Sequence, residues 1–173
     1  IEGMGNEIVA RLIESGNLTD VADYYDLSQD TLEHLDTGRT TTKGERIELG
    51  PVVASKLMLS INESKKRSLA RVLFGLGIRH VGKTTAEAIA KVYPSMNLLR
   101  GAKADDLAAI DGVGSIIAQS IFDFFATEDN VKVVERLAAA GVTMEEALHE
   151  NTLPQTLAGL TFELTGSLVE SGM

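Results

Sequence analysis

The sequence predicts an all-α fold of four tandem units in two pairs, with one short β-strand at the C-terminal end. Three observations lead to this prediction. A glycine-centred pattern recurs four times along the chain, and apolar residues follow each glycine with helical spacing. Alternation with a period of two occurs only in the stretch LTFELTG, residues 160–166. Each unit is therefore expected to be a helix, a short glycine turn and a second helix.

Four glycines define the repeat, namely Gly5, Gly50, Gly82 and Gly114. The second and third intervals are both 32 residues, whereas the first is 45 residues. The excess falls in a polar stretch, residues 37–49, which we interpret as an inserted loop. The four units are expected near residues 1–16, 27–62, 66–93 and 102–126.

Each glycine is followed by residues that share one helical face. Four positions on stand Val9, Ala54, Ala86 and Ala118, and seven positions on stand Leu12, Leu57, Ile89 and Ile121. Offsets of four and seven lie on the same side of an α-helix. In the fourth unit we expect the core to contain Ile117, Ala118, Ile121, Phe122 and Phe125.

The segments that precede three of the glycines also have helical patterns. They are residues 27–35, where Ser28 or Asp30 is the expected N-cap, and residues 66–78 and 102–110. Together with the helices expected after the glycines, these segments give the order helix, glycine turn, helix.

Composition excludes several classes of protein. The chain has no cysteine, which rules out disulfides and thiolate metal sites within it. Neither a basic leader nor an apolar run of about 18 residues is found, so we expect no membrane segment. Because the chain begins at Ile1 and stops at ESGM, we expect a piece of a longer cytosolic protein.

Charge is distributed unevenly along the chain. The net charge of −9 argues against a nucleic-acid ligand at first sight. Residues 38–103, however, hold thirteen basic and four acidic side chains, whereas the segments on either side are strongly acidic. Such a basic middle segment can attract a polyanion locally, although it can equally be an ordinary solvated surface.

A tight glycine turn that opens a helix is suited to binding an anion. The first N–H groups of the helix lack partners, and they lie at the positive end of the helix dipole. Glycine also lets a ligand approach the backbone closely. The ligand is not a dinucleotide, because no strand precedes the turn and the third glycine is missing. A P-loop frame matches at residues 77–84 but follows a helical rather than a strand pattern. Four such turns in one chain favour a polymer of phosphates, which is a nucleic-acid backbone.

The candidate DNA-binding residues lie at the turns and in the insert. They are Gly3, Gly5, Asn6, Arg79, His80, Gly82, Lys83, Gly112, Gly114 and Ser115, together with Lys43 and Arg46. Two plainer interpretations stay open: the glycines can simply relieve strain at helix corners, and His80 can be a solvated turn residue. No catalytic residue and no metal ligand is predicted, since neither His34 nor His149 has a second histidine nearby.

These units resemble the helix-hairpin-helix domain of bacterial NAD-dependent DNA ligases. The resemblance rests on the stretches IEGMGNEIVARLIESG, LARVLFGLGIRHVGKTTAEAIA and LAAIDGVGSIIAQSI. It covers about residues 1–144, which we expect to form one DNA-binding domain. A linker at 145–156 then leads to residues 157–173, which resemble the first strand of a BRCT domain.

The resemblance implies non-sequence-specific binding of duplex DNA around a nick. The parent enzyme would join 5′-phosphate and 3′-hydroxyl ends in replication and repair, using NAD, zinc and magnesium. This chain has no KxDG adenylation motif, so it is expected to be non-catalytic and to hold no cofactor itself. Its implied partners are nicked double-stranded DNA and the remaining domains of the same ligase chain, with no membrane. The implied location is the cytoplasm, in association with the nucleoid.

The second unit departs from the family pattern. Residues 37–49 split its hairpin, and Pro51 removes the N–H group of one helix-opening residue. We expect a poorer phosphate site there, with Arg39, Lys43 and Arg46 contacting DNA as flexible side chains instead. Two rival interpretations are a similar hairpin domain from another DNA repair protein, and a protein-interaction scaffold that would suit the acidic flanks.

Overall fold

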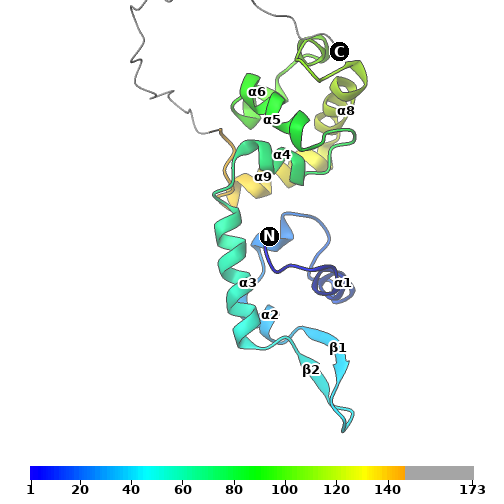
Figure 1. Ribbon diagram of the computed structural model, residues 1–173, viewed down its shortest axis with the longest axis vertical. Helices are drawn as coiled ribbons and strands as arrows, with labels where there is room; N and C mark the ends of the chain where they lie inside the picture. Colours follow the sequence, from blue (N-terminus) through cyan, green and yellow to red (C-terminus); the bar gives the residue numbers. More distant parts are fainter. Residues whose placement is uncertain (147–173) are drawn as a thin grey trace, which may run out of the picture.

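The computed structural model describes residues 1–146, and these form an elongated molecule with two halves (Figure 1). The N-terminal half contains α1 (Asn6–Glu14), η1 (Asp23–Tyr25), α2 (Gln29–Glu33), β1 (Asp36–Thr40), β2 (Arg46–Glu48) and α3 (Pro51–Ser64). The C-terminal half contains α4 (Leu69–Gly75), α5 (Lys83–Val92), α6 (Met96–Arg100), α7 (Ala104–Ala108), α8 (Ser115–Ala126) and α9 (Glu128–Ala139). Each half has its own apolar core.

The four aligned glycines are the N-cap residues of four helices, which confirms the main prediction of the repeat. Gly5 opens α1, Gly50 opens α3, Gly82 opens α5 and Gly114 opens α8. In the second, third and fourth units the alanine four positions after the glycine is buried: Ala54, Ala86 and Ala118 are at most 1% exposed. Leucine or isoleucine seven positions after each glycine is at most 2% exposed. The small residue thus lets a neighbouring helix approach, and the larger one fills the core.

The predicted first helices form, but they are short. Ser28 is the N-cap of α2 and accepts a hydrogen bond from the Thr31 N–H at 3.0 Å. The segments 66–78 and 102–110 supply α4 and α7. The sequence patterns did not predict α6 or α9, which contribute Met96, Leu99 and Val134 to the C-terminal core.

One core prediction was wrong. Ala118 and Ile121 are buried, and Ile117 and Phe125 are half-buried against the same cluster. Phe122, by contrast, is 50% exposed. Because it follows Ile121 by a single residue, it is turned about 100° away from the core face of α8.

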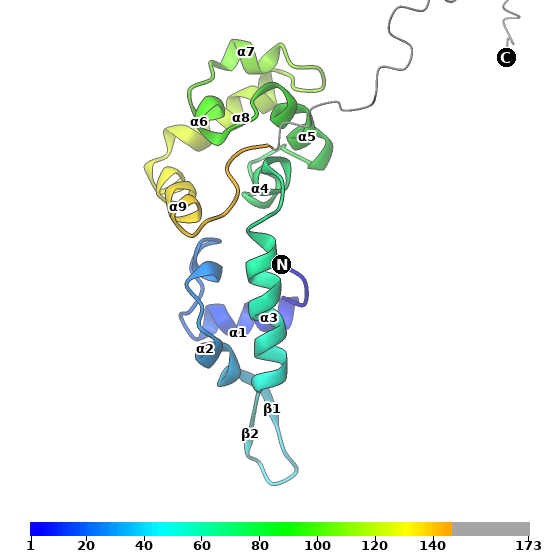
Figure 2. The same cartoon turned by 90° about the vertical axis from the view of Figure 1, so that its left-hand side faces the viewer.

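The insert is a β-ribbon, not the loop that we expected. Strands β1 and β2 pair antiparallel, and a bulge interrupts the register between Asp36 and Arg39. At the base of the ribbon the Leu49 N–H donates to the Leu35 carbonyl at 2.9 Å. This hydrogen bond joins the two ends of the insert at its base. The ribbon extends from there beyond α3, at the far end of the molecule (Figure 2). The described residues are thus mostly helical with a two-stranded sheet, rather than all-α.

Several domain predictions fall partly or wholly outside residues 1–146, among them the strand at 160–166 and the BRCT-like start at 157–173. Within the described part, two glycine-opened helices lie in each half. The arrangement as four motifs in two pairs stays a prediction. Residues 145 and 146, where the linker was expected to begin, pack on the C-terminal half: the Glu146 carboxylate accepts from the Ala70 N–H at 3.2 Å.

An ionic contact joins the two halves. Arg136 on α9 donates to Asp20, Asp23 and Asp26 at 2.8, 2.7 and 2.6 Å. Beside it, Ala22 packs against Leu137 and Val142 in a small third cluster. The hydrogen bond from Arg136, aided by two backbone N–H donors, lowers the pKa of Asp23 from 3.8 to about 2.

This lowered pKa predicts acid sensitivity of the contact between the halves. A carboxyl whose pKa is lower in the folded state stabilises the fold above its unfolded pKa, and that stabilisation is lost as pH falls from about 4 towards 2. We expect the native chain to lose more stability over this range than Arg136→Gln, in which no cation holds Asp23. Urea unfolding at pH 5 and pH 2.5 measures the difference. The control is Lys132→Gln, whose partners Glu128 and Asp129 lie on its own helix. If the native chain and Arg136→Gln lost the same free energy of unfolding between pH 5 and pH 2.5, the expectation would be contradicted.

Candidate nucleic-acid interface

The helices α5 and α8 begin with unsatisfied backbone donors. Their N-caps, Gly82 and Gly114, provide no side-chain hydrogen bond, and neither helix has an acidic residue in its first turn. The first intrahelical bonds run from Ala86 to Gly82 and from Ala118 to Gly114. The three N–H groups before each of these have no acceptor among residues 1–146.

Most other helices among residues 1–146 have a cap or a counter-charge, although α3, like α5 and α8, has neither a side-chain cap nor an acidic residue in its first turn. Ser28 and Ser95 cap α2 and α6 with their hydroxyl groups. The carboxylate of Glu146 reaches the first turn of α4. The remaining short helix α7 and the helix α9 place acidic residues in their first turns, where these offset the helix dipole. The positive N-termini of α5 and α8 are thus left without an internal counter-charge.

The turns before α5 and α8 have the same backbone geometry. The Val81 N–H donates to the Ile78 carbonyl at 3.0 Å, and the Val113 N–H donates to Ile110 at 2.9 Å. The third residue of each turn is left-handed, with φ of 66° at His80 and 77° at Gly112. A left-handed residue in this place is typical of a type II turn. The valine after it is buried, so each turn is anchored to the core while its glycine edge faces outward.

His80 is strained by this geometry. Within residues 1–146 it is the one non-glycine residue with positive φ, a conformation that costs an L-residue roughly 1–2 kcal/mol. Its side chain is exposed, and no ion pair or hydrogen bond from its ring is formed among the described residues. The exposed imidazole therefore stands in the turn directly before the open N-terminus of α5.

Gly82 and Gly114 are not required by the protein's own packing. Each has an extended backbone, with φ of −83° and −77°, which any residue can adopt. A Cβ built at either position meets nothing within 4 Å. Glycine at these sites therefore leaves open space in front of the N–H donors, and this space suits the close approach of an external group.

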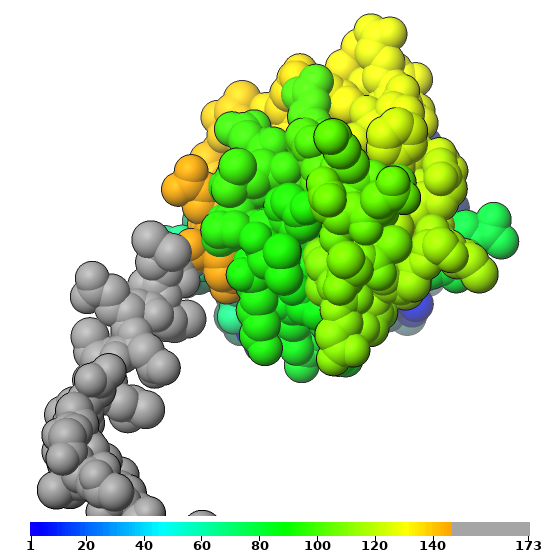
Figure 3. Space-filling view, turned by 90° about the horizontal axis from the view of Figure 1, so that it is seen from above, coloured from blue at the N-terminus to red at the C-terminus, as the bar shows by residue number. Residues whose placement is uncertain are grey.

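A surface hollow of about 580 Å³ brings two hairpins together. It is lined by Arg79 and His80 from the turn before α5 and by Ser115, Ile116, Gln119, Ser120 and Asp123 from α8. Three of the predicted site residues, Arg79, His80 and Ser115, thus share one hollow. Sequence reasoning missed Ile116, which is 70% exposed beside the free N–H groups. Seen from the end of the molecule opposite the β-ribbon, the segment from α5 to α8 covers most of the surface (Figure 3).

The first hairpin is in the other half and has similar geometry. Gly3 is left-handed with φ of 79°, and its carbonyl accepts from the Gly5 N–H at 3.0 Å. Asn6 occupies the first helical position of α1 and is exposed, as a donor to a ligand would need to be. The first turn of α1 does contain Glu7, which forms an ion pair with Arg39 of the ribbon at 3.2 Å.

The second hairpin differs from the others. The left-handed residue is Gly50 itself, with φ of 80°, and Pro51 occupies the first helical position. Residues on the ribbon are also not all free: Arg46 lies 3.7 Å from Asp36. Lys43, near the tip, has no ion pair among residues 1–146. Lys83, at the first position of α5 in the third hairpin, has its Nζ 4.0 Å from the Glu87 carboxylate.

Nothing in residues 1–146 forms a group of three or more side chains that could hold a metal ion. His34 hydrogen-bonds to the Asp30 carbonyl through Nδ1, and His149 lies outside the described residues. No helix in this part of the chain has the length and apolar character needed to span a membrane.

Comparison with known proteins agrees with this geometry. Residues 71–134, which include both turns that line the hollow, match the helix-hairpin-helix motif family. The chain is 41% identical over 169 residues to a DNA ligase of Desulforamulus reducens and 41% identical over 168 residues to DNA ligase 1 of Deinococcus deserti. Over nearly its whole length the chain thus corresponds to a segment of DNA ligases. A DNA ligase of Methylacidiphilum infernorum is 36% identical over 170 residues.

These matches cover 97–98% of the chain but only 23–24% of each ligase. The chain therefore spans about a quarter of the length of the ligases that it matches. The free N–H groups, the left-handed turns and the hollow all lie within the part shared with them.

Proposed function

We propose that this chain binds the sugar-phosphate backbone of duplex DNA around a nick, without reading base sequence, as a non-catalytic part of an NAD-dependent DNA ligase. The observation that supports this most strongly is the pair of uncapped, uncompensated helix N-termini at Gly82 and Gly114. Backbone N–H groups at a helix N-terminus are suited to phosphate oxygens and carry no sequence information.

Four hairpins of this kind form the proposed interface, arranged in two pairs along the molecule. Single contacts of this type are weak, but several on one rigid body act together through a high effective concentration. The second hairpin contributes least, since Pro51 supplies no N–H group, and Lys43 and Arg46 on the ribbon add flexible cationic contacts. In the parent ligase, NAD, zinc and magnesium serve parts of the enzyme outside the quarter that this chain matches, and the enzyme acts on the chromosome in the cytoplasm during replication and repair.

Fluorescence anisotropy across a salt series tests this function. The chain is titrated against a labelled nicked duplex, the same duplex without a nick and a single strand, at 25–200 mM salt. We expect the logarithm of the association constant for the duplex to fall linearly with the logarithm of the salt concentration, with a slope of about −0.9 for each phosphate contacted. Similar affinity for duplexes of different base sequence is also expected. Binding that persists unchanged at high salt, or that prefers one sequence strongly, would contradict the proposal.

A further inference from the structure

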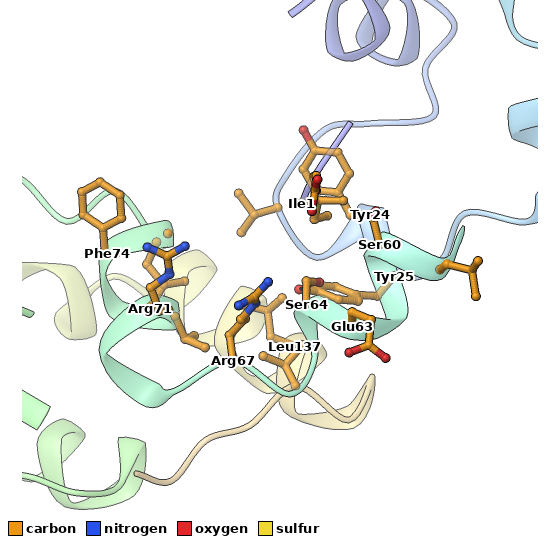
Figure 4. Close-up of a pocket in the computed structure, with 17 residues that line it drawn as sticks. Ile1, Tyr24, Tyr25, Ser60, Glu63, Ser64, Arg67, Arg71, Phe74 and Leu137 are labelled. Atoms are coloured by element: carbon orange, nitrogen blue, oxygen red, sulfur yellow. Dashed lines mark hydrogen bonds between the residues drawn. The ribbon is translucent and has the colours of Figure 1, made fainter. Parts of the chain in front are cut away.

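A cleft of about 800 Å³ lies between the two halves, and neither the repeat nor the hairpins account for it. Its walls come from the start of the chain, η1, the end of α3, α4 and the end of α9. Figure 4 shows Arg67 and Arg71 extending from one wall, with Phe74 farther along α4 and Ile1 and Tyr24 across the cleft.

Arg67 and Arg71 are exposed cations that line the same cleft. Arg67 lies in the short connection between α3 and α4, whereas Arg71 and Phe74, which is 48% exposed, lie on α4 about one helical turn apart. Neither arginine forms an ion pair or a side-chain hydrogen bond within residues 1–146. Most other arginines are engaged, among them Arg11, Arg39, Arg46, Arg100 and Arg136.

The position of the cleft connects two of the hairpins. Ile1 and Glu2, which precede the first hairpin, line one side of it. On the other side, Phe74, Gly75 and Leu76 line it at the end of α4, and the turn at 78–81 follows at once. A strand that contacts both the first and the third hairpin would therefore pass over Arg67 and Arg71.

We propose that Arg67 and Arg71 bind phosphates of a DNA strand that crosses this cleft between the first and third hairpins. The proposal rests on the function proposed above and extends its footprint across both halves. Guanidinium groups pair with phosphate oxygens in bidentate fashion, which suits a backbone contact better than a compact ammonium does.

Continuity with the third hairpin favours a phosphate strand over an acidic peptide as the occupant. Residues 65–91 contain seven lysines and arginines against a single acid, Glu87. The cleft wall is thus continuous with the most basic segment of the chain, which also contains the third hairpin. Of the acids that line the cleft, Glu63 is already paired with Lys66 at 3.0 Å. Glu2 faces the cleft from the opposite wall.

The test compares salt slopes of two variants with equal charge changes. Arg67→Gln/Arg71→Gln is titrated with a labelled nicked duplex by anisotropy, alongside Lys91→Gln/Lys103→Gln. The control lysines are exposed, have no ion pair among residues 1–146, and stand at helix ends away from the glycine turns. We expect the arginine variant to flatten the log–log salt slope by about two units, since two phosphate contacts are lost. The control should keep the native slope.

Each outcome discriminates between the proposals. If the native chain binds duplex DNA but the arginine variant keeps the native slope, the cleft contact is wrong and the proposed function stands. Equal flattening in both variants would also overturn the cleft contact, because only net charge would then matter. If the native chain does not bind duplex DNA at low salt, both proposals fail. Circular dichroism of both variants confirms that each retains the native helix content.

Discussion

The double variant Gly82→Asp/Gly114→Asp is expected to fold as the native chain does while its affinity for duplex DNA falls by about a hundredfold or more. Aspartate is a better N-cap than glycine, and both sites have extended backbone and open space for a side chain. The free energy of unfolding should therefore stay the same or rise by a few tenths of a kcal/mol per helix.

Binding should fall because each carboxylate takes the place of a phosphate. An aspartate N-cap accepts the N–H groups that the ligand needs, and it adds a negative charge in front of them. A hydrogen bond to a charged group contributes about 1.5–3 kcal/mol, which is roughly tenfold to a hundredfold in affinity for each site. Anisotropy gives the affinity, and urea unfolding gives the stability of the same preparation.

The matched control is Ser28→Asp/Ser95→Asp. It introduces the same two negative charges at two N-caps, but these helices are already capped by their serine hydroxyls. We expect it to bind DNA nearly as well as the native chain. Should the control lose as much affinity as the glycine variant, the effect would be one of net charge, and the helix N-termini of α5 and α8 would not be the phosphate sites.

The second large effect concerns stability. Ile121→Ala is expected to lower the free energy of unfolding by about 2–5 kcal/mol, because Ile121 is 1% exposed in the larger core cluster and its removal leaves a cavity. For a chain of this size, each kcal/mol lowers Tm by roughly 2–4 °C. Thermal unfolding followed by circular dichroism measures the change.

Phe122→Ala is the control for this prediction. It removes a larger side chain from the next position, but Phe122 is half-exposed and contributes little to the core. We expect a change within about 0.5–1 kcal/mol, as for a surface substitution. Equal losses in the two variants would show that the orientation of α8 differs from the one described.

The repeat predicted the helix starts well because these depend on interactions between residues close together in the sequence. A glycine N-cap with small and large apolar residues four and seven positions later sets where a helix starts and which face it buries, independently of distant parts of the chain. All four helix starts were confirmed on this basis. Of the two caps predicted for α2, Ser28 or Asp30, the structure has Ser28, whose partner Thr31 lies only three residues away.

The β-ribbon could not be predicted from apolar alternation. Most of its residues are exposed on both faces. Without a buried face, its sequence TGRTTTKGERIE does not alternate between apolar and polar residues. Its pairing rests on backbone hydrogen bonds and on a turn at Gly44, which is left-handed. The helix α6 is only five residues long and was too short for its period to be recognised.

The candidate site was partly predictable for the same reasons. The turns at His80 and Gly112 were found from their position two residues before an aligned glycine. The cleft with Arg67 and Arg71 depends instead on how the two halves pack against each other. The ionic contact between the halves, made by Arg136, joins residues more than 100 positions apart. No spacing in the sequence shows which arginines are already paired and which are free.

The most direct test of the central claim is an amide NMR titration of the ¹⁵N-labelled chain with a short nicked duplex. The claim is that the first N–H groups of α5 and α8 hold phosphates. The largest downfield shifts should then fall on residues 83–85 and 115–117, and they should diminish as salt is added. If these amides keep their free positions while DNA saturates the protein, the hairpins do not bind phosphate, and the interface lies elsewhere on the molecule.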